Sequence, residues 1–274
     1  MAFVNVNGKE IFYQVHSHAG TPLVLIMGLG GTSDGWKLQV EELQKQYSVI
    51  TPDNRGVGRS AMPDEPYSME MFADDLAAIF AQENIDQAIV LGASMGGLIA
   101  QEFYHKYPEK IKALILCCTG VGPNDPEFVM AEPEVLDLLA EVYPEDEKEQ
   151  HKYLGEYVNL FYHQSYYARN PGLVDWMHHK KTTKGQPEYA NKRQLESCFT
   201  HTHNSPRLKG ITVPTLVIHA EDDLIWPIGN AIYLAENIKG AELYIMEEAG
   251  HMFFVEKPEE FNKAVLDFLQ SKKL

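Results

Sequence analysis

The sequence predicts an α/β fold in which helices cover both faces of a mostly parallel sheet. Short, continuous apolar runs, such as PLVLIMG from Pro22 and AIVLG from Ala88, are typical of strands that are buried on both faces. Segments with the apolar spacing of a helix lie between such runs, for example Phe72, Leu76 and Ile79. Alternation of this kind favours parallel strands that are joined by helices.

The first elements follow from local signals. Two strand-like segments, FVNV and KEIFYQV, flank Asn7-Gly8, a pair that favours positive φ at both positions and therefore predicts a hairpin at one edge of the sheet. After the strand from Pro22, the pattern predicts a short helix near 36–45, a strand at 47–52, a glycine-bearing turn at 53–60 and a helix around Phe72.

The later strands and helices also alternate, but the segment 122–206 interrupts them. The AIVLG strand leads into a helix that Pro108 ends, and IKALILCC at 111–118 is the next strand. From 122 to 206 the pattern turns mostly helical and polar. The remaining elements are a strand in VPTLVIHA, a helix at 228–237, a strand at 242–246 and a last helix near Pro258.

We therefore expect one α/β core with an eight-stranded sheet, made of residues 1–121 and 207–274. Core strands lie on both sides of 122–206, so we expect that segment to be a helical cap over the strand ends and not an independent domain. Ligands of open α/β sheets bind outside the carboxyl ends of the strands, which directs attention to the loops there.

Composition and charge restrict the function classes. The 274 residues include 39 acidic and 23 basic side chains, and the net charge of −16 would repel nucleic acid and anionic lipid. The apolar run from Leu23 to Leu29 is too short to span a bilayer, so no membrane association is expected. The start, MAFVNVNGKEIFY, lacks the pattern of a signal peptide, which favours the cytoplasm. A homodimer is compatible with the sequence.

The segment Gly92-Ala93-Ser94-Met95-Gly96-Gly97 follows the AIVLG strand and opens a helix. The G-x-S-x-G pattern alone is weak evidence, but a sharp turn from strand to helix is the setting that exposes a nucleophilic serine. Glycines flank such a serine because side chains there would collide. The helix that starts at Met95 also points its free N–H groups at the reaction centre.

Two further loops follow predicted strands and supply an acid and a base. Asp223 comes after VPTLVIHA, and His251 comes after the strand at 242–246. A serine needs a neighbouring base, and an imidazole needs a carboxylate that fixes its tautomer. Ser94, Asp223 and His251 stand in the order serine, acid, histidine, which is the order of the fold that carries this serine turn.

These residues make the chain similar to the α/β-hydrolase superfamily over its whole length, within the cap-bearing esterase, lactonase and haloperoxidase-like branch. The matching segments are MGLGG at 27–31, DNRGVGRS at 53–60, GASMGG at 92–97, D-x-x-x-P at 223–227 and AGHMFFVEKPEEF at 249–261.

The resemblance implies roles for five residues. Ser94 would be the nucleophile, His251 the general base and acid, and Asp223 the carboxylate that orients it. The backbone N–H groups of Leu29 and Met95 would form the oxyanion hole. Relatives commonly carry histidine before the glycine of the first motif, whereas this chain has Met27, a change that alters the hydrogen bonding of the loop but not its two backbone N–H groups.

Other residues compete for these roles. Asp222 and Asp125 are alternative triad acids, but the spacing to Pro227 favours Asp223. Asp53 and Arg55 look functional, although in the family this turn is chiefly structural.

Metal and thiol chemistry are disfavoured. Six histidines lie in the segment 122–206: His151, His163, His178, His179, His201 and His203. They lack the cysteine or carboxylate partners of a metal site, so no metal and no cofactor is expected. Cys117 and Cys118 do not lie in a sharp strand-to-helix turn of the kind that exposes a nucleophile. Together with Cys198 they are interpreted as buried small hydrophobic residues.

The segment 122–206 is rich in aromatic residues. Helix packing explains most of them, and the rest are candidates for the roof of an apolar substrate pocket; they are Phe128, Tyr143, Tyr153, Tyr157, Phe161, Tyr162, Tyr166, Tyr167, Trp176, Tyr189 and Phe199. Trp226, beside the acid, is a further candidate for the pocket wall.

The sequence thus predicts a cofactor-independent serine hydrolase that cleaves a small carboxylic ester through an acyl-enzyme. A lactonase of the 3-oxoadipate enol-lactonase type is the nearest alternative. A carbon–carbon bond hydrolase fits less well because its relatives carry Gly-Pro and PGFG-like turns, where this chain has GLGG and RGVG. A non-catalytic receptor on this fold is the alternative from another class, and it would normally lack a triad member.

Overall fold

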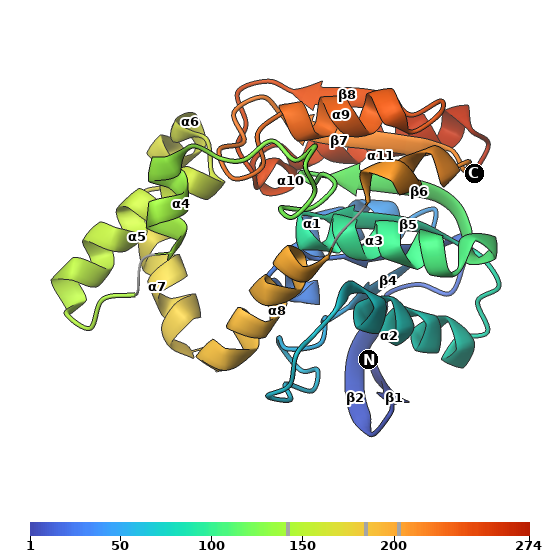
Figure 1. Cartoon of the computed structure of the whole chain (residues 1–274), viewed down its shortest axis with the longest axis horizontal. Coiled ribbons are helices and arrows are strands. Elements are labelled where there is room, and N and C mark those ends of the chain that lie inside the picture. The colour runs from blue at the N-terminus through green and yellow to red at the C-terminus, as the bar shows by residue number, and fades with distance from the viewer. Residues whose placement is uncertain (141–142, 184–185, 202–203) are drawn as a thin grey trace.

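The computed structural model describes residues 1–140, 143–183, 186–201 and 204–274. An eight-stranded sheet in the order β1-β2-β4-β3-β5-β6-β7-β8 forms its centre (Figure 1). The strands are β1 (Ala2–Val6), β2 (Lys9–Val15), β3 (Pro22–Ile26), β4 (Ser48–Pro52), β5 (Ala88–Ala93), β6 (Ile111–Cys117), β7 (Thr215–Ala220) and β8 (Glu242–Met246).

The sheet is antiparallel at one edge and parallel elsewhere. β1 pairs with β2, and β2 pairs with β4, in antiparallel fashion, whereas every pair from β4 to β8 is parallel. Asn7 and Gly8 close the predicted hairpin with φ of 50° and 81°. The predicted α/β fold, with its leading hairpin, is therefore confirmed.

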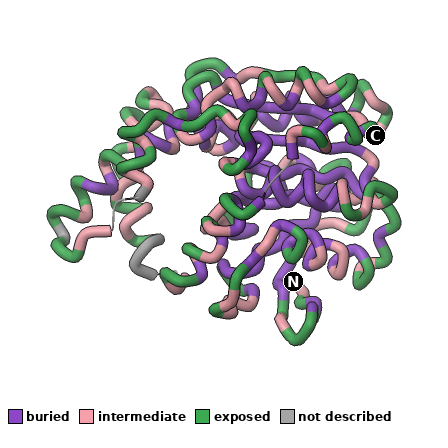
Figure 2. Tube along the Cα trace, viewed as in Figure 1, coloured by how far each residue is buried: buried purple, intermediate pink, exposed green. Residues whose placement is uncertain are grey.

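Helices cover both faces of the sheet, as the unbroken apolar strands require. Successive residues of β3 alternate between two hydrophobic cores: Val24 and Ile26 belong to one, and Leu23 and Leu25 belong to the other. Figure 2 shows this buried centre in purple. The first core includes α2 (Met69–Gln82), α3 (Met95–Lys106) and α9 (Gly229–Asn237); the second includes α1 (Lys37–Leu43), α10 (Phe253–Glu256) and α11 (Pro258–Ser271).

The segment 122–206, called the insertion below, follows β6 and precedes β7. In Figure 1 its first four helices lie together beside the sheet, and the last leads back to the core. They are α4 (Pro133–Ala140), α5 (Glu147–Phe161), α6 (Gln164–Arg169), α7 (Leu173–Thr183) and α8 (Glu188–Thr200).

The short helix predicted near 36–45 is present as α1, but other short helices were not expected from the sequence. In the described part of the chain, three of these are 3-10 helices, at Ser33–Trp36, Pro108–Lys110 and Ser205–Gly210. α10 is separate from α11 because Lys257, at φ −134° and ψ 60°, precedes Pro258, and the residue before a proline disfavours helical angles. Among the described residues, no helix is long and apolar enough to cross a membrane.

Candidate active site

Ser94 lies in a strained turn between β5 and α3. Its φ of 55° and ψ of −121° are angles that a residue with a side chain rarely adopts. The surroundings hold this conformation, because the N–H of Ser94 donates to the Cys117 carbonyl at 2.9 Å and its own carbonyl accepts from Thr119 Oγ1 at 2.8 Å.

The glycines around Ser94 permit close packing. A Cβ on Gly92 or Gly96 would come within 3 Å of backbone atoms, and one on Gly97 would come equally close to the Thr119 side chain. The pattern quoted from the sequence is thus a steric requirement of this turn.

Asp223 and His251 lie in the loops after β7 and β8 and are joined by a hydrogen bond. Asp223 Oδ2 lies 2.8 Å from His251 Nδ1, while Oδ1 accepts from the N–H groups of Ile225 and Trp226, both at 2.9 Å. A carboxylate can only accept, so the proton of this bond belongs to Nδ1 and the lone pair of His251 is on Nε2.

Charge and burial act in opposite directions on Asp223. Burial raises the pKa of its carboxyl group, but His251 and His219 more than offset this, and the pKa lies well below its usual value. Asp223 is therefore ionised, as a carboxylate that orients an imidazole must be.

His219 was not predicted to take part in this site. It is the penultimate residue of β7, its side chain is fully buried, and its Nε2 lies 2.6 Å from the Trp226 carbonyl and 3.4 Å from Asp223 Oδ2. Its position four residues before the acid was the only available signal in the sequence.

The loop after β3 packs directly on Ser94. A Cβ on Gly28 would lie 3.0 Å from Ser94 Cβ and 3.5 Å from its Oγ, so only glycine lets the loop come this close. Neither the N–H of Leu29, the next residue, nor that of Met95 donates a hydrogen bond to any residue in the described ranges.

Met27 fits the place where relatives commonly carry histidine because glycines lie opposite it. A Cβ on Gly31 or Gly35 would come within 3 Å of the Met27 side chain. The thioether thus fills a space that these two glycines leave open, and the path of the loop is kept.

The end of α5 approaches His251. The ring of Phe161 lies 5.9 Å from the His251 ring in an edge-on arrangement, and its carbonyl accepts from Met252 N–H at 2.8 Å. The ring centroid of Tyr157 lies 4.9 Å from that of Phe161, and the ring centroid of Tyr153 lies 5.4 Å from that of Tyr157. A row of aromatic rings thus runs from the His251 loop along α5.

Glu256 joins the His251 loop to the insertion. Its Oε1 accepts from Gly250 N–H at 3.0 Å, and its Oε2 accepts from His163 N–H at 3.1 Å. Burial raises the pKa of Glu256 to about 7, while these two hydrogen bonds oppose the shift.

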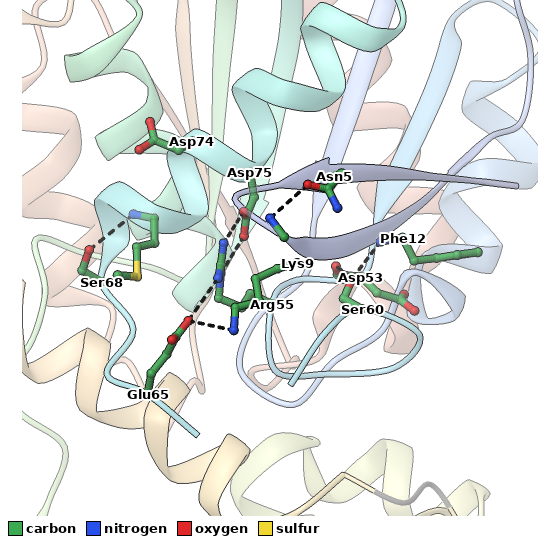
Figure 3. Close-up of polar contacts among 12 residues, drawn as sticks. Asn5, Lys9, Phe12, Asp53, Arg55, Ser60, Glu65, Ser68, Asp74 and Asp75 are labelled. Carbon is green, nitrogen blue, oxygen red and sulfur yellow. Dashed lines mark hydrogen bonds and ion pairs between the residues drawn. The ribbon is translucent and has the colours of Figure 1, made fainter. Parts of the chain in front are cut away.

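The turn at 53–60 carries a buried ion pair (Figure 3). Arg55 contacts Asp75 with two nitrogens, at 2.6 and 3.0 Å, and lies 3.7 Å from Glu65. Asp53 accepts from the N–H groups of Ser33 and Arg59. These contacts tie the turn to α2 and to the loop after β3, a structural role for both predicted residues.

Asp222 and Asp125, the alternatives to Asp223, have partners other than His251. Asp222 is half exposed and lies 3.7 Å from His163 Nε2. Asp125 accepts from the N–H groups of Glu127 and Ser205, at 3.1 and 2.9 Å.

Trp226, the candidate for the pocket wall, is buried and packs edge-on against Phe128, with 5.0 Å between the ring centroids.

The three cysteines are buried, and burial raises the pKa of each thiol. Of the insertion histidines, His203 lies outside the described residues, and the described part of the chain contains no cluster of three metal-binding side chains.

An open, mostly parallel sheet with a strained serine at a strand-to-helix turn defines the class of α/β-hydrolase proteins. The chain belongs to this family: the model described as "alpha/beta hydrolase fold" matches residues 21–258. It is accordingly a hydrolase.

Several curated and solved proteins are similar over nearly the whole chain. The protein RutD of Azorhizobium caulinodans, which is described provisionally as a carbamate hydrolase, is 28% identical over 98% of both chains. A poly(3-hydroxyalkanoate) depolymerase of Ectopseudomonas oleovorans is 30% identical over 92% of this chain and 86% of its own. The crystal structure of the enol-lactonase from Burkholderia xenovorans LB400 is 26% identical, with a TM-score of 0.81 over 98% of this chain and 100% of its own.

Proposed function

We propose that the protein is a carboxylic ester hydrolase in which Ser94 is the nucleophile, His251 the general base and acid, and Asp223 the orienting carboxylate. One observation carries this proposal. A serine in a strained turn and a hydrogen-bonded Asp223–His251 pair follow strands β5, β7 and β8 of one parallel series, whose carboxyl ends share an edge of the sheet.

In the proposed acylation step, His251 Nε2 takes the proton of Ser94 Oγ as this oxygen attacks the ester carbonyl. The N–H groups of Leu29 and Met95 donate to the oxyanion that forms, and the ionised Asp223 stabilises the imidazolium. The imidazolium then gives its proton to the leaving alcohol, and the acyl group stays on Ser94.

In the second step, a water molecule attacks the acyl-enzyme while His251 removes its proton. The tetrahedral intermediate uses the same two N–H donors, and it collapses to the free acid as the imidazolium returns the proton to Ser94 Oγ. The proposed chemistry needs no redox or group-carrying cofactor.

The surroundings of His251 and the names of two relatives support an ester substrate. The aromatic row on α5 offers an apolar surface next to the proposed base, which suits the hydrocarbon part of an ester. Two of the three relatives above are named for a polyester and an enol-lactone, both of which contain the same carbonyl–oxygen bond.

A lactonase of the 3-oxoadipate enol-lactonase type is the second candidate. It is supported by the likeness to the enol-lactonase structure over the full chain. A lactone is a cyclic ester, so the same residues would act on it and the leaving alcohol would stay attached to the acyl group.

The proposal is tested with Ser94→Ala and the matched control Ser271→Ala, which lies at the end of α11. Both variants should keep the circular dichroism spectrum and melting temperature of the native protein. The first should lose hydrolysis of p-nitrophenyl acetate and butyrate, and only the control should react with a fluorophosphonate. Full residual activity of Ser94→Ala would refute the proposal. Relative kcat/KM for esters and lactones of matched size separates the two candidates.

A further inference from the structure

Gln194 reaches from the insertion into the loop that packs on Ser94. It lies on α8, its side chain is fully buried, and both of its amide atoms bind backbone outside its own helix. Gln194 Oε1 accepts from Gly30 N–H at 3.0 Å, and Nε2 donates to the Arg55 carbonyl at 2.7 Å. A buried amide with both ends satisfied in this way fixes the groups it binds.

A second amide holds the same loop from the other side. Asn54 Nδ2 donates to the Met27 carbonyl at 2.8 Å. Because each peptide unit is planar, the Met27 carbonyl fixes the peptide before Gly28, and the Gly30 N–H fixes the peptide after Leu29. The peptide that carries the Leu29 N–H lies between these two planes, and its own carbonyl, that of Gly28, accepts from the Gly31 N–H at 3.1 Å. Its direction therefore depends on this backbone turn together with the two amides that hold the planes on either side.

The position of this peptide matters because Gly28 touches Ser94. The Cβ that Gly28 lacks would lie 3.5 Å from Ser94 Oγ. A small rotation of the loop would turn the Leu29 N–H away from an oxygen bound at Ser94, and electrostatic stabilisation of that kind depends on donors that are already in place.

We propose that Gln194 is a positioning residue through which the insertion holds the Leu29 N–H in the oxyanion hole. The inference rests on the proposed function and deepens it: the segment 122–206 supplies part of the transition-state stabilisation as well as the surroundings of the substrate. It also names a residue in the insertion whose substitution should change kcat.

The simpler interpretation is that Gln194 only fastens the insertion to the core. Other residues on or near α8 already do this: Tyr189 Oη donates to the Met62 carbonyl at 2.9 Å, and Arg193 Nη2 contacts Asp64 at 3.1 Å. The polar contacts of these two side chains are with Met62, Asp64 and Glu196, outside the loop at 27–31. Tyr189→Phe therefore removes one hydrogen bond between insertion and core, from the same helix, and is the matched control.

The test compares Gln194→Met with Tyr189→Phe. Methionine keeps the length of the side chain and removes both amide contacts. In Gln194→Met we expect kcat for p-nitrophenyl butyrate to fall on the order of tenfold to a hundredfold with KM nearly unchanged, whereas Tyr189→Phe should keep kcat. Rates are referred to active sites titrated with a fluorophosphonate, so a loss of folded protein does not count as a loss of kcat.

A transition-state mimic provides the readout that a purely structural role would not move. A trifluoromethyl ketone forms a tetrahedral oxyanion on the serine, so its inhibition constant should rise in Gln194→Met by the factor by which kcat/KM falls. Equal kcat in the two variants, or a change in KM alone, would overturn the inference.

A third variant keeps the test decisive if Gln194→Met folds poorly. Gln194→Glu keeps an acceptor for the Gly30 N–H, and in its ionised form it loses the donor to the Arg55 carbonyl. Its kcat should therefore lie between that of the native protein and that of Gln194→Ala, which has neither group. A kcat as low as that of a variant without any acceptor, such as Gln194→Ala, would count against the proposal. If Ser94→Ala kept full activity, the proposed function would fail instead.

Discussion

The Nε2 atom of His219 lies 3.4 Å from Oδ2 of Asp223, the same oxygen that binds His251. The Trp226 carbonyl, 2.6 Å from this Nε2, can only accept, so the nitrogen carries a hydrogen directed into the acid loop. Asp223 therefore has a histidine on each side: one is proposed to act on substrate, and the other holds the carboxylate and its loop together.

Removal of the His219 donor should alter the pH profile. In His219→Phe, Asp223 loses a neighbouring donor, its negative charge acts more strongly on His251, and the protonated imidazole persists to higher pH. The acid limb of kcat/KM should move to higher pH, and kcat should fall several-fold. His105→Phe is the control, because His105 is half-buried on α3, outside the site, and partial burial lowers its pKa to about 4. Identical profiles for the two variants would contradict this role.

Asparagine substitutions should show which aspartate orients His251: Asp223, Asp222 or Asp125. In Asp223→Asn the amide can donate to His251 and stabilise the wrong tautomer, so kcat should fall by about ten-thousandfold. Asp222→Asn and Asp125→Asn should stay within about threefold of native kcat. Steady-state kinetics on p-nitrophenyl butyrate checks this order, and a larger loss in Asp125→Asn would move the acid to the end of β6.

Gly28→Ala should reduce activity in a folded protein. The added Cβ would lie 3.0 Å from Ser94 Cβ and 3.1 Å from the Ala93 carbonyl, so the loop must shift by a few tenths of an ångström. We expect kcat to fall by about tenfold or more. Gly155→Ala on α5 is the control, since its Cβ would meet nothing within 4 Å and should stabilise the helix by about 0.5–1 kcal/mol.

Glu256 should make stability depend on pH. Burial raises its folded-state pKa to about 7, from a usual value of 4.5, so between these values the folded chain binds more protons than the unfolded chain. This contribution is fully present below pH 4.5 and is lost as the pH rises through 7. The native protein should lose on the order of 1–3 kcal/mol relative to Glu256→Gln between pH 5 and pH 8. Urea unfolding at both values measures it, and parallel stability curves would exclude it.

Arg55→Met should lower stability with little change in kcat per folded molecule. The substitution leaves the buried Asp75 without its partner, which costs about 3–5 kcal/mol in comparable pairs. Arg55→Met combined with Asp75→Leu should recover much of this loss, because no uncompensated charge stays buried. Urea unfolding of the single and double variants tests it, and strictly additive losses would argue against a coupled pair.

The fold was predictable because its signals are local. Each core strand is an apolar run bounded by turn residues. The pair Asn7-Gly8 favours positive φ at both positions, and this alone predicts a two-residue hairpin turn. The start of the last helix was marked by Pro258, but the one-turn helix α10 before it was less accessible, since its Phe253 and Phe254 pack in the second core against residues far away in sequence.

The residues proposed to react were accessible for a similar reason: they occur in short motifs. Gln194 was not, because one glutamine among the polar residues of a helix has no signature, and its partners lie at Gly30 and Arg55, far away in sequence. Glu256 belonged to a recognised motif, yet its contact with His163 depends on where the insertion returns to the core.

The placement of the insertion also sets an order of events during synthesis. β6 and β7 are neighbours in the sheet, with Leu114 opposite Thr215, but the whole of 118–214 is made between them. β6 is therefore an unpaired apolar edge until the ribosome has completed the insertion. The strained turn at Ser94 is held by Cys117 and Thr119, which are already present, whereas Asp223 and His251 are made only after the insertion. The proposed nucleophile is thus assembled before the base that would activate it.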